Sequence, residues 1–125
     1  GGEPLKNQTY RMTMLFDFYG ELLTDRQKEF FDLYYNDDLS LAEIAENYGI
    51  SSQGVRDAIV RAENTMTELE DKTGLLRRFM RLRDKIDSIE NAARRIDELN
   101  RHQYENPELT GLTQEILACA GALKE

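Results

Sequence analysis

The side chains with the clearest binding chemistry follow Gly49, in a stretch with the spacing of a DNA-reading helix. Gln53 can hydrogen-bond to an adenine edge, and Arg56 can bind a guanine edge or a phosphate. Asp57 lies beside them and would repel phosphates. Serine hydroxyls can also hold phosphates, so the candidate nucleic-acid contacts are Ser51, Ser52, Gln53, Arg56, Val60 and Arg61. The alternative is a solvated helix face whose charges only keep the protein soluble.

A second group of candidate binding residues is a cluster of arginines in the motif LLRRFMRLR. It consists of Arg77, Arg78, Arg81 and Arg83. Arg77 and Arg81 are four residues apart and therefore share a helix face. Such a patch can hold RNA phosphates or an acidic protein surface. The alternative is a solvated helix flank that forms ion pairs with Asp84 and Asp87.

The residue types that catalysis or metal binding would need are scarce. The chain has one cysteine, Cys119, and one histidine, His102, so neither an internal disulfide nor a zinc site is expected. We expect Cys119 to be a buried packing residue. Asp37 and Asp38 are adjacent carboxylates without a neighbouring nucleophile, which is typical of a turn. With no glycine-rich phosphate loop, the sequence predicts a non-enzymatic protein without metal, cofactor or small-molecule substrate.

The DNA-reading helix requires two helices that cross at a tight corner, and LAEIAENYGISSQGVRDAI has the residues for one. The first helix needs a small residue where the second packs, and Ala45 is that residue. Four residues later the turn needs a positive φ, which Gly49 adopts without strain. The apolar residues that fill the crossing are Ile44, Tyr48, Ile50, Val55 and Ala58. This pattern predicts a helix-turn-helix, and the alternative is a plain helical hairpin with a glycine turn.

The remainder of the first half also predicts helices. Apolar residues recur at helical spacing, and the expected helices cover residues 12–23, 25–35, 41–48 and 51–73. Two capping boxes mark helix starts, Thr24 with Gln27 and Ser40 with Glu43. Gly74 marks a break after the fourth helix. No run of strand length alternates with period two, so we predict an all-α fold.

After Gly74 the apolar residues repeat in heptads. Their steps alternate between four and three, and they are Leu75, Phe79, Leu82, Ile86, Ile89, Ala93 and Ile96. This seam predicts a long helix over about 75–104 and self-association, either as a coiled coil with a second copy or by packing back on the first half. HQYENPELTGL is typical of a loop, and a short final helix is expected over about 112–123.

Three segments follow from these patterns. Residues 1–10 are expected to be disordered and partly left over from cloning, residues 11–73 to form the helix-turn-helix domain, and residues 74–125 to form a helical extension. The single cysteine fits a reducing cytoplasm. No apolar run is long enough to span a membrane.

Charge is unevenly divided along the 125 residues. The net charge is -8, from 24 acidic and 16 basic residues. Up to Thr73 there are 15 acidic and 7 basic residues, which leaves 9 of each after it. The half with the helix-turn-helix thus carries all of the excess negative charge, whereas DNA-binding domains usually carry positive charge.

Over residues 11–75 the sequence resembles the YlxM-type proteins of Gram-positive bacteria. The motifs that carry the resemblance are LFDFYGELLTDRQ, LYYNDDLSLAEIAE and GISSQGVRDAIVRAE. The resemblance implies an all-helical fold with a helix-turn-helix similar to the promoter-reading domain of sigma factors. Genes of this family typically lie beside the gene for the signal recognition particle GTPase. The resemblance therefore implies an accessory or regulatory role in that pathway, with the GTPase or its RNA as a partner.

The resemblance also implies DNA binding, by similarity of fold. Two departures bear on it. Ser52 stands where the family often has an arginine, which removes a cation from the start of the DNA-reading helix. The sequence after Leu75 diverges from the family pattern, so no partner site is carried over there.

These observations support several hypotheses. The first is a non-enzymatic accessory or regulatory protein of the signal recognition particle pathway, which acts through protein contacts and could in addition contact RNA through the arginine cluster. The alternative is a sequence-specific transcription regulator that binds duplex DNA as a homodimer through the heptad seam. A dimeric scaffold whose long helix is its only working surface is the third.

Overall fold

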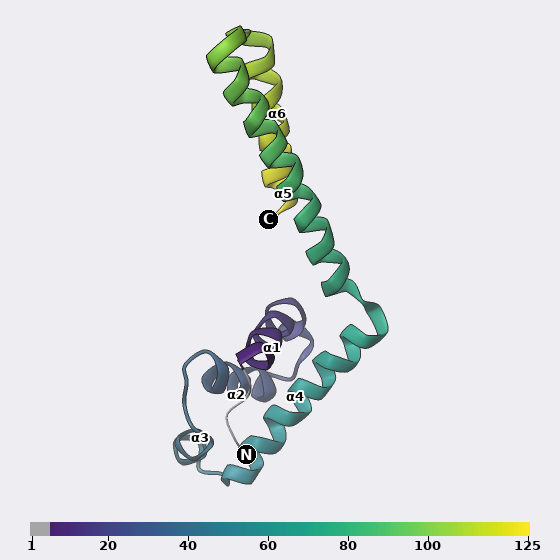
Figure 1. Ribbon diagram of the computed structural model, residues 1–125. Coiled ribbons are helices and arrows are strands. Elements are labelled where there is room, and N and C mark those ends of the chain that lie inside the picture. The colour runs from purple at the N-terminus through teal and green to yellow at the C-terminus, as the bar shows by residue number, and fades with distance from the viewer. Residues whose placement is uncertain (1–5) are drawn as a thin grey trace. The chain divides into compact units, whose positions relative to one another are not determined.

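The computed structural model describes the backbone of residues 6–125 and the side chains from Thr9 onward. All of the regular elements in this part of the chain are helices (Figure 1), which confirms the predicted all-α fold. The chain divides into two compact units, of which the first ends at Leu76 and the second is Arg77–Glu125. No helix in the described range is long and apolar enough to cross a bilayer.

The first unit contains four α-helices. They are α1 (Lys6–Tyr19), α2 (Asp25–Tyr35), α3 (Leu41–Tyr48) and α4 (Ser52–Thr73), and a 3-10 turn, Gly20–Leu22, follows α1. Figure 1 shows the shorter helices gathered along the long α4, which contacts all three of them. The sequence placed the first helix over 12–23. Residues 6–10 are helical, in contrast to the disorder expected for them, and residues 1–5 lie outside the described residues.

The core of this unit consists of two apolar clusters on either side of α2. Phe30 and Phe31 are adjacent in the sequence and fully buried, but Phe30 packs against α3 and the start of α4, whereas Phe31 packs against α1. Phe31 is sandwiched between the rings of Phe16 and Tyr35, with centroid distances of 4.6 and 4.3 Å. The aromatic residues of the first half therefore form its core, as their helical spacing indicates.

The helix boundaries follow local signals that the sequence displays. The Thr24–Gln27 and Ser40–Glu43 capping boxes are both formed, and they start α2 and α3. Each satisfies backbone N–H groups that the first turn of a helix leaves without partners. Gly74 ends α4 with a φ of 60°, which confirms the predicted break.

The first turn of α5 (Leu75–Leu99) belongs to the first unit. The Leu76 side chain is buried in the cluster around Phe31. The buried Glu70 carboxylate accepts hydrogen bonds from the Tyr19 hydroxyl at 2.7 Å and from the Leu76 N–H at 2.9 Å. The first unit consequently extends past Thr73, where the sequence placed its end.

The second unit is a helical hairpin. The rest of α5 continues into a π-helical turn, Asn100–Tyr104, and α6 (Pro107–Leu123) runs back alongside α5 (Figure 1). The sequence predicted helices over about 75–104 and 112–123. In the structure α6 starts earlier because Asn106 caps it and Pro107 occupies its first position, where a missing N–H costs nothing.

Polar contacts join the two helices of the hairpin. The Asn100 side chain bonds the backbone of Asn106 at 2.8 Å, and the Thr113 hydroxyl donates to Asp97 at 3.4 Å. Near the chain end, the Lys124 ammonium bonds Asp87 at 2.6 Å and Glu90 at 2.9 Å. The apolar side chains buried in this unit are Ile86, Ala93 and Ala120.

Candidate nucleic-acid interface

The corner between α3 and α4 has the geometry that the sequence predicted. Gly49 has a φ of 66°, and its N–H bonds the Ala45 carbonyl. The Ile50 N–H donates to the same carbonyl at 3.1 Å. The Ser51 hydroxyl then accepts from the Gly54 N–H at 3.0 Å and caps α4. The chain therefore turns within a few residues, as a helix-turn-helix requires.

The six apolar framework residues of the corner pack into one cluster. Ile44, Ala45 and Val55 are buried, and Tyr48, Ile50 and Ala58 are half-buried against them. The Tyr48 ring also meets the Phe30 ring edge to face, with centroids 5.0 Å apart. Burial on both sides of the corner fixes the direction of α4, so its opposite face points outward.

The candidate contact residues lie on that outward face. Ser52, Gln53, Arg56 and Arg61 are exposed, and Val60 is half-buried. The Gln53 amide donates to the Asp57 carboxylate at 2.9 Å. To bind an adenine edge, Gln53 would have to exchange this bond for one to the base.

The charge around this face is unfavourable for phosphates. Residues 41–63 contain two basic side chains, Arg56 and Arg61, and four acidic ones, Glu43, Glu46, Asp57 and Glu63. Contacts to several phosphates usually supply the non-specific part of DNA affinity. Two arginines opposed by four carboxylates make that contribution small.

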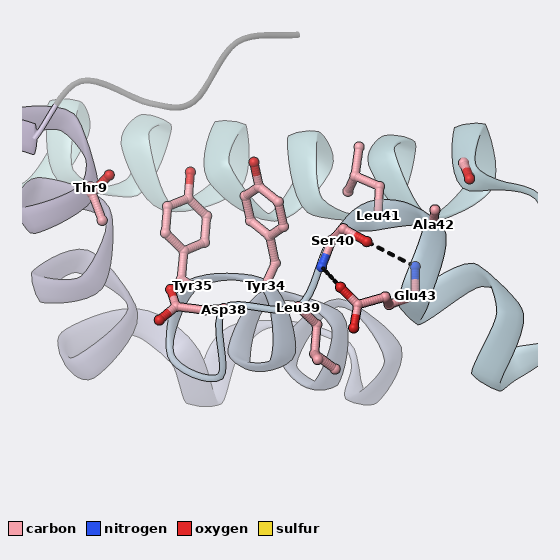
Figure 2. A pocket seen from close by; sticks show the side chains of 10 residues that line it. Thr9, Tyr34, Tyr35, Asp38, Leu39, Ser40, Leu41, Ala42 and Glu43 are labelled. Atoms are coloured by element: carbon pink, nitrogen blue, oxygen red, sulfur yellow. Dashed lines mark hydrogen bonds between the residues drawn. The ribbon is translucent and has the colours of Figure 1, made fainter.

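A groove of about 740 Å³ lies next to the helix-turn-helix and was not foreseen from the sequence. Figure 2 shows that Tyr34 and Tyr35 extend from α2 toward the same side of it, and that Ser40 and Glu43 form their capping box at its edge. The Tyr35 hydroxyl donates to Glu63 at 3.0 Å, and burial together with this carboxylate raises the pKa of Tyr35. The charged side chains that line the groove, Asp38 and Glu43, are acidic, so it too repels phosphates.

The arginine cluster lies at the start of the second unit. Arg78, Arg81 and Arg83 are exposed on α5. The ion pair of Asp87 is with Lys124, and this contact lowers the pKa of Asp87 and raises that of Lys124. Arg83 adds a weaker attraction to Asp87. Arg78 and Arg81 lie three residues apart on one side of α5, whereas Arg83 points to the opposite side, so the cluster does not form a single cationic face.

The heptad seam divides into two rows. Ile86 and Ala93 are buried in the hairpin and Phe79 is half-buried, whereas the row Leu75, Leu82, Ile89 and Ile96 is exposed. The prediction that Cys119 is buried was wrong, because α6 directs its neighbour Ala120 toward α5 and leaves Cys119 exposed. His102 is also exposed, in the π-helical turn. In the part of the chain that the structure describes, no acidic, histidine and cysteine side chains group to hold a metal ion.

Comparison of the chain with known proteins identifies a family that it matches. The family model described as "Putative helix-turn-helix protein, YlxM / p13 like" matches residues 6–106. The chain is 43% identical over 105 residues to UPF0122 proteins of Thermoanaerobacter sp. and Thermoanaerobacter pseudethanolicus, which is 84% of this chain and 86% of theirs. A UPF0122 protein of Geobacillus kaustophilus is 41% identical over 109 residues, which is 87% of this chain and 94% of its own length.

The match also corrects one interpretation of the sequence. The sequence pattern after Leu75 suggests divergence from the family, but the family model continues through residue 106 and so includes α5. The resemblance of residues 11–75 is confirmed. The protein therefore belongs to the UPF0122 family of YlxM / p13-like helix-turn-helix proteins.

Proposed function

We propose that this protein is a non-enzymatic regulatory protein of the bacterial signal recognition particle pathway, and that its first unit binds a basic protein partner. The observation that supports the proposal is the charge of the helix-turn-helix half, which has 15 acidic and 7 basic residues up to Thr73. Membership in the YlxM-like family supports the choice of this pathway, because genes of YlxM-type proteins typically lie beside that of the targeting GTPase.

The exposed acids of the helix-turn-helix suit such a partner. Glu46 on α3 and Asp57 on α4 are both exposed near the corner, and Asp37 and Asp38 are exposed in the turn after α2. Surfaces of one sign steer a partner of the opposite sign and accelerate encounter, especially at low salt. In this proposal the buried corner is a rigid support, and the exposed acidic side chains around it favour a basic protein surface over RNA.

The arginine cluster is the proposed RNA contact of the same protein. Arg78, Arg81 and Arg83 are exposed, and guanidinium groups bind phosphate oxygens in a bidentate manner. The first unit would then bind the GTPase while α5 binds phosphates of its RNA.

Binding of the full-length protein to the purified signal recognition particle GTPase tests the proposal. We expect an association at about 50 mM salt that weakens as screening increases. Glu46→Lys should weaken it, because the substitution reverses an exposed charge on α3 without touching a capping box. Glu115→Lys on α6 is the matched control, since it changes the net charge equally in the other unit. Absence of binding at low salt would contradict the proposal.

A second candidate is a dimeric, sequence-specific DNA-binding regulator. The observation that favours it is the exposure of Gln53 and Arg56 on the outward face of α4. Arg56→Ala should then cost about 1–3 kcal/mol of DNA affinity and relax specificity at one base pair. Failure to retain any duplex from a random pool at about 50 mM salt would exclude this function.

A further inference from the structure

The second unit exposes several large apolar side chains on each of its helices. On α5, Leu82, Ile89 and Ile96 are 54%, 52% and 43% exposed and lie seven residues apart. On α6, Leu112, Ile116 and Leu123 are 47%, 39% and 63% exposed. Cys119 is exposed between them, at the same helical spacing. Each helix therefore carries an uncovered apolar stripe.

Both stripes lie on the same side of the hairpin. On α5, Ile89 directly precedes Glu90, which accepts a hydrogen bond from Lys124 at the end of α6. On α6, Cys119 directly precedes Ala120, which is buried in the hairpin. One residue corresponds to a rotation of about 100°. Each stripe residue therefore points about 100° away from the contact between the helices, in the direction opposite to the winding of its own helix. Because the two helices run in opposite directions, these two rotations point to the same side of the hairpin.

The same relation holds at other levels of the hairpin. Ile96 precedes Asp97 and Leu112 precedes Thr113, and the Asp97 and Thr113 side chains bond one another. Leu123 precedes Lys124, which bonds to Asp87 and Glu90. We call this side the hairpin face, defined by Leu82, Ile89, Ile96, Leu112, Ile116, Cys119 and Leu123.

This distribution is the reverse of a normal hydrophobic core. The two helices meet through small apolar side chains and polar groups, including the buried Glu90, Asp97 and Asn100. Ile86 is the one large aliphatic side chain buried between them, whereas six others lie on the hairpin face. A helix pair with one apolar face is half of a four-helix bundle, and it is completed when that face is covered by two more helices.

Charge along the hairpin is also divided. Residues 78–85 contain four basic side chains and one acidic side chain, for a net charge of +3. Residues 97–108, around the turn, contain four acidic side chains and one arginine, for a net charge of -3, with His102 neutral. The two segments lie at opposite ends of the hairpin, about 30 Å apart at 1.5 Å per residue. Each hairpin is therefore basic at one end and acidic at the other.

From these features we infer that two copies of the chain pack their hairpin faces together as an antiparallel four-helix bundle. A twofold axis perpendicular to the helices places the acidic turn of each copy beside residues 78–85 of the other. A parallel arrangement would instead put like charges together. A second copy is the occupant that supplies both the matching apolar stripe and the complementary ends, in a self-complementary interface. This goes beyond the proposed function and does not depend on which partner the helix-turn-helix binds.

Sedimentation of the full-length protein over a range of concentrations is the first test. We expect a dimer, and we expect Ile89→Asp to raise its dissociation constant by at least about 30-fold, as at an interface hot spot. Met80→Asp is the matched control. Met80 is also exposed on α5, but it lies nine residues from Ile89 and therefore on the opposite side of the helix. Ile116→Lys should reproduce the effect from α6, and circular dichroism verifies that each variant remains helical.

A charge swap tests the antiparallel orientation. Arg78→Glu and Glu108→Arg should each weaken the dimer, and the double variant should restore it. These residues lie at opposite ends of one hairpin, so restoration requires a pair formed between copies. If the double variant is weaker than both single variants, the antiparallel arrangement is overturned.

The reactivity of Cys119 identifies other occupants of the hairpin face. In the dimer, the alkylation rate should fall as protein concentration rises, and Ile89→Asp should abolish that dependence. A monomer with a protected Cys119 would indicate that the first unit of the same chain covers the face. A monomer with a fully reactive Cys119 would indicate a different protein as the occupant. Either result overturns the inference of a second copy.

Discussion

The two units of this protein use apolar residues in opposite ways. In the first unit, large side chains such as Phe30 and Phe31 are fully buried, and Glu70 is the one carboxylate buried with them among the described residues. In the second unit Glu90 and Asp97 are buried, whereas Ile89 and Leu82 are exposed. The comparison shows that a helical periodicity of apolar residues does not by itself indicate that a unit buries its own apolar face. The first unit closes its own core, and the second presents half of one.

The largest effect that would sharpen this comparison is the removal of a core aromatic ring. Phe31→Ala should lower the free energy of unfolding by about 3–5 kcal/mol, because the ring is fully buried and stacks on Phe16 and Tyr35. Leu82→Ala, the control from the hairpin face, should leave the unfolding of the first unit unchanged. Urea titrations followed by circular dichroism measure both. Equal losses would show that the two units share one cooperative core.

Glycine substitutions should have opposite signs in the two units. Gly49→Ala should destabilise the first unit by about 1–2 kcal/mol, since a Cβ strains the positive φ there. Gly111→Ala on α6 should stabilise the hairpin by about 0.5–1 kcal/mol, because Gly111 lies within a helix with open space around it. Thermal unfolding of the two variants measures the difference. A neutral Gly49→Ala would show that the corner does not need the left-handed turn.

The smallest contrast is in pH dependence. Burial is the main cause that raises the pKa of Tyr19 above 10.0, and Glu70 also raises it. This contribution to the first unit is complete below pH 10 and is lost as the phenol ionises at higher pH. The Lys124 hydrogen bond lowers the pKa of Asp87 below 3.8, so its contribution to the hairpin is complete above that pH and is lost in more acid solution. Lys124, whose pKa is raised mainly by Asp87, keeps its charge beyond pH 10.5.

Two variants separate these contributions. Tyr19→Phe should reduce the loss of stability above about pH 10, and Lys124→Met should reduce the loss in acid. Unfolding midpoints in urea at each pH are the measurement. If Tyr19→Phe instead changes how the unfolding midpoint depends on pH in acid, then Tyr19 is not the source of the loss of stability at high pH.

The features that were predicted correctly from the sequence depend on local chemistry. Capping boxes, the glycine turn at Gly49 and the α3–α4 corner each involve residues a few positions apart, so their types and spacing are sufficient. The start of α6 was placed too late because Asn106 and Pro107 were interpreted as loop residues, although they also form a helix cap. Cys119 was misplaced because small neighbours suggested burial on both sides of the helix.

Within the candidate site, the outward face of α4 was predicted from local spacing, whereas the groove was not, because it depends on contacts between distant segments. The groove beside Tyr34 and Tyr35 is lined by residues of α1, α2, α3 and α4 and of the turn after α2, and no single stretch displays it. The heptad seam likewise does not specify which of its rows meets α6. That choice depends on the register of the hairpin, which is set by polar contacts such as Asp97 with Thr113.

The Glu70 carboxylate has a practical consequence for dissecting this protein. It accepts one hydrogen bond from the Tyr19 hydroxyl of α1 and another from the backbone N–H of Leu76, which lies beyond Gly74. A fragment cut at the glycine would bury a carboxylate that has lost a donor and would open a hole where Leu76 packs. A stand-alone helix-turn-helix piece should therefore be cut within α5, so that it keeps a short stub of that helix as a lid on its own interior.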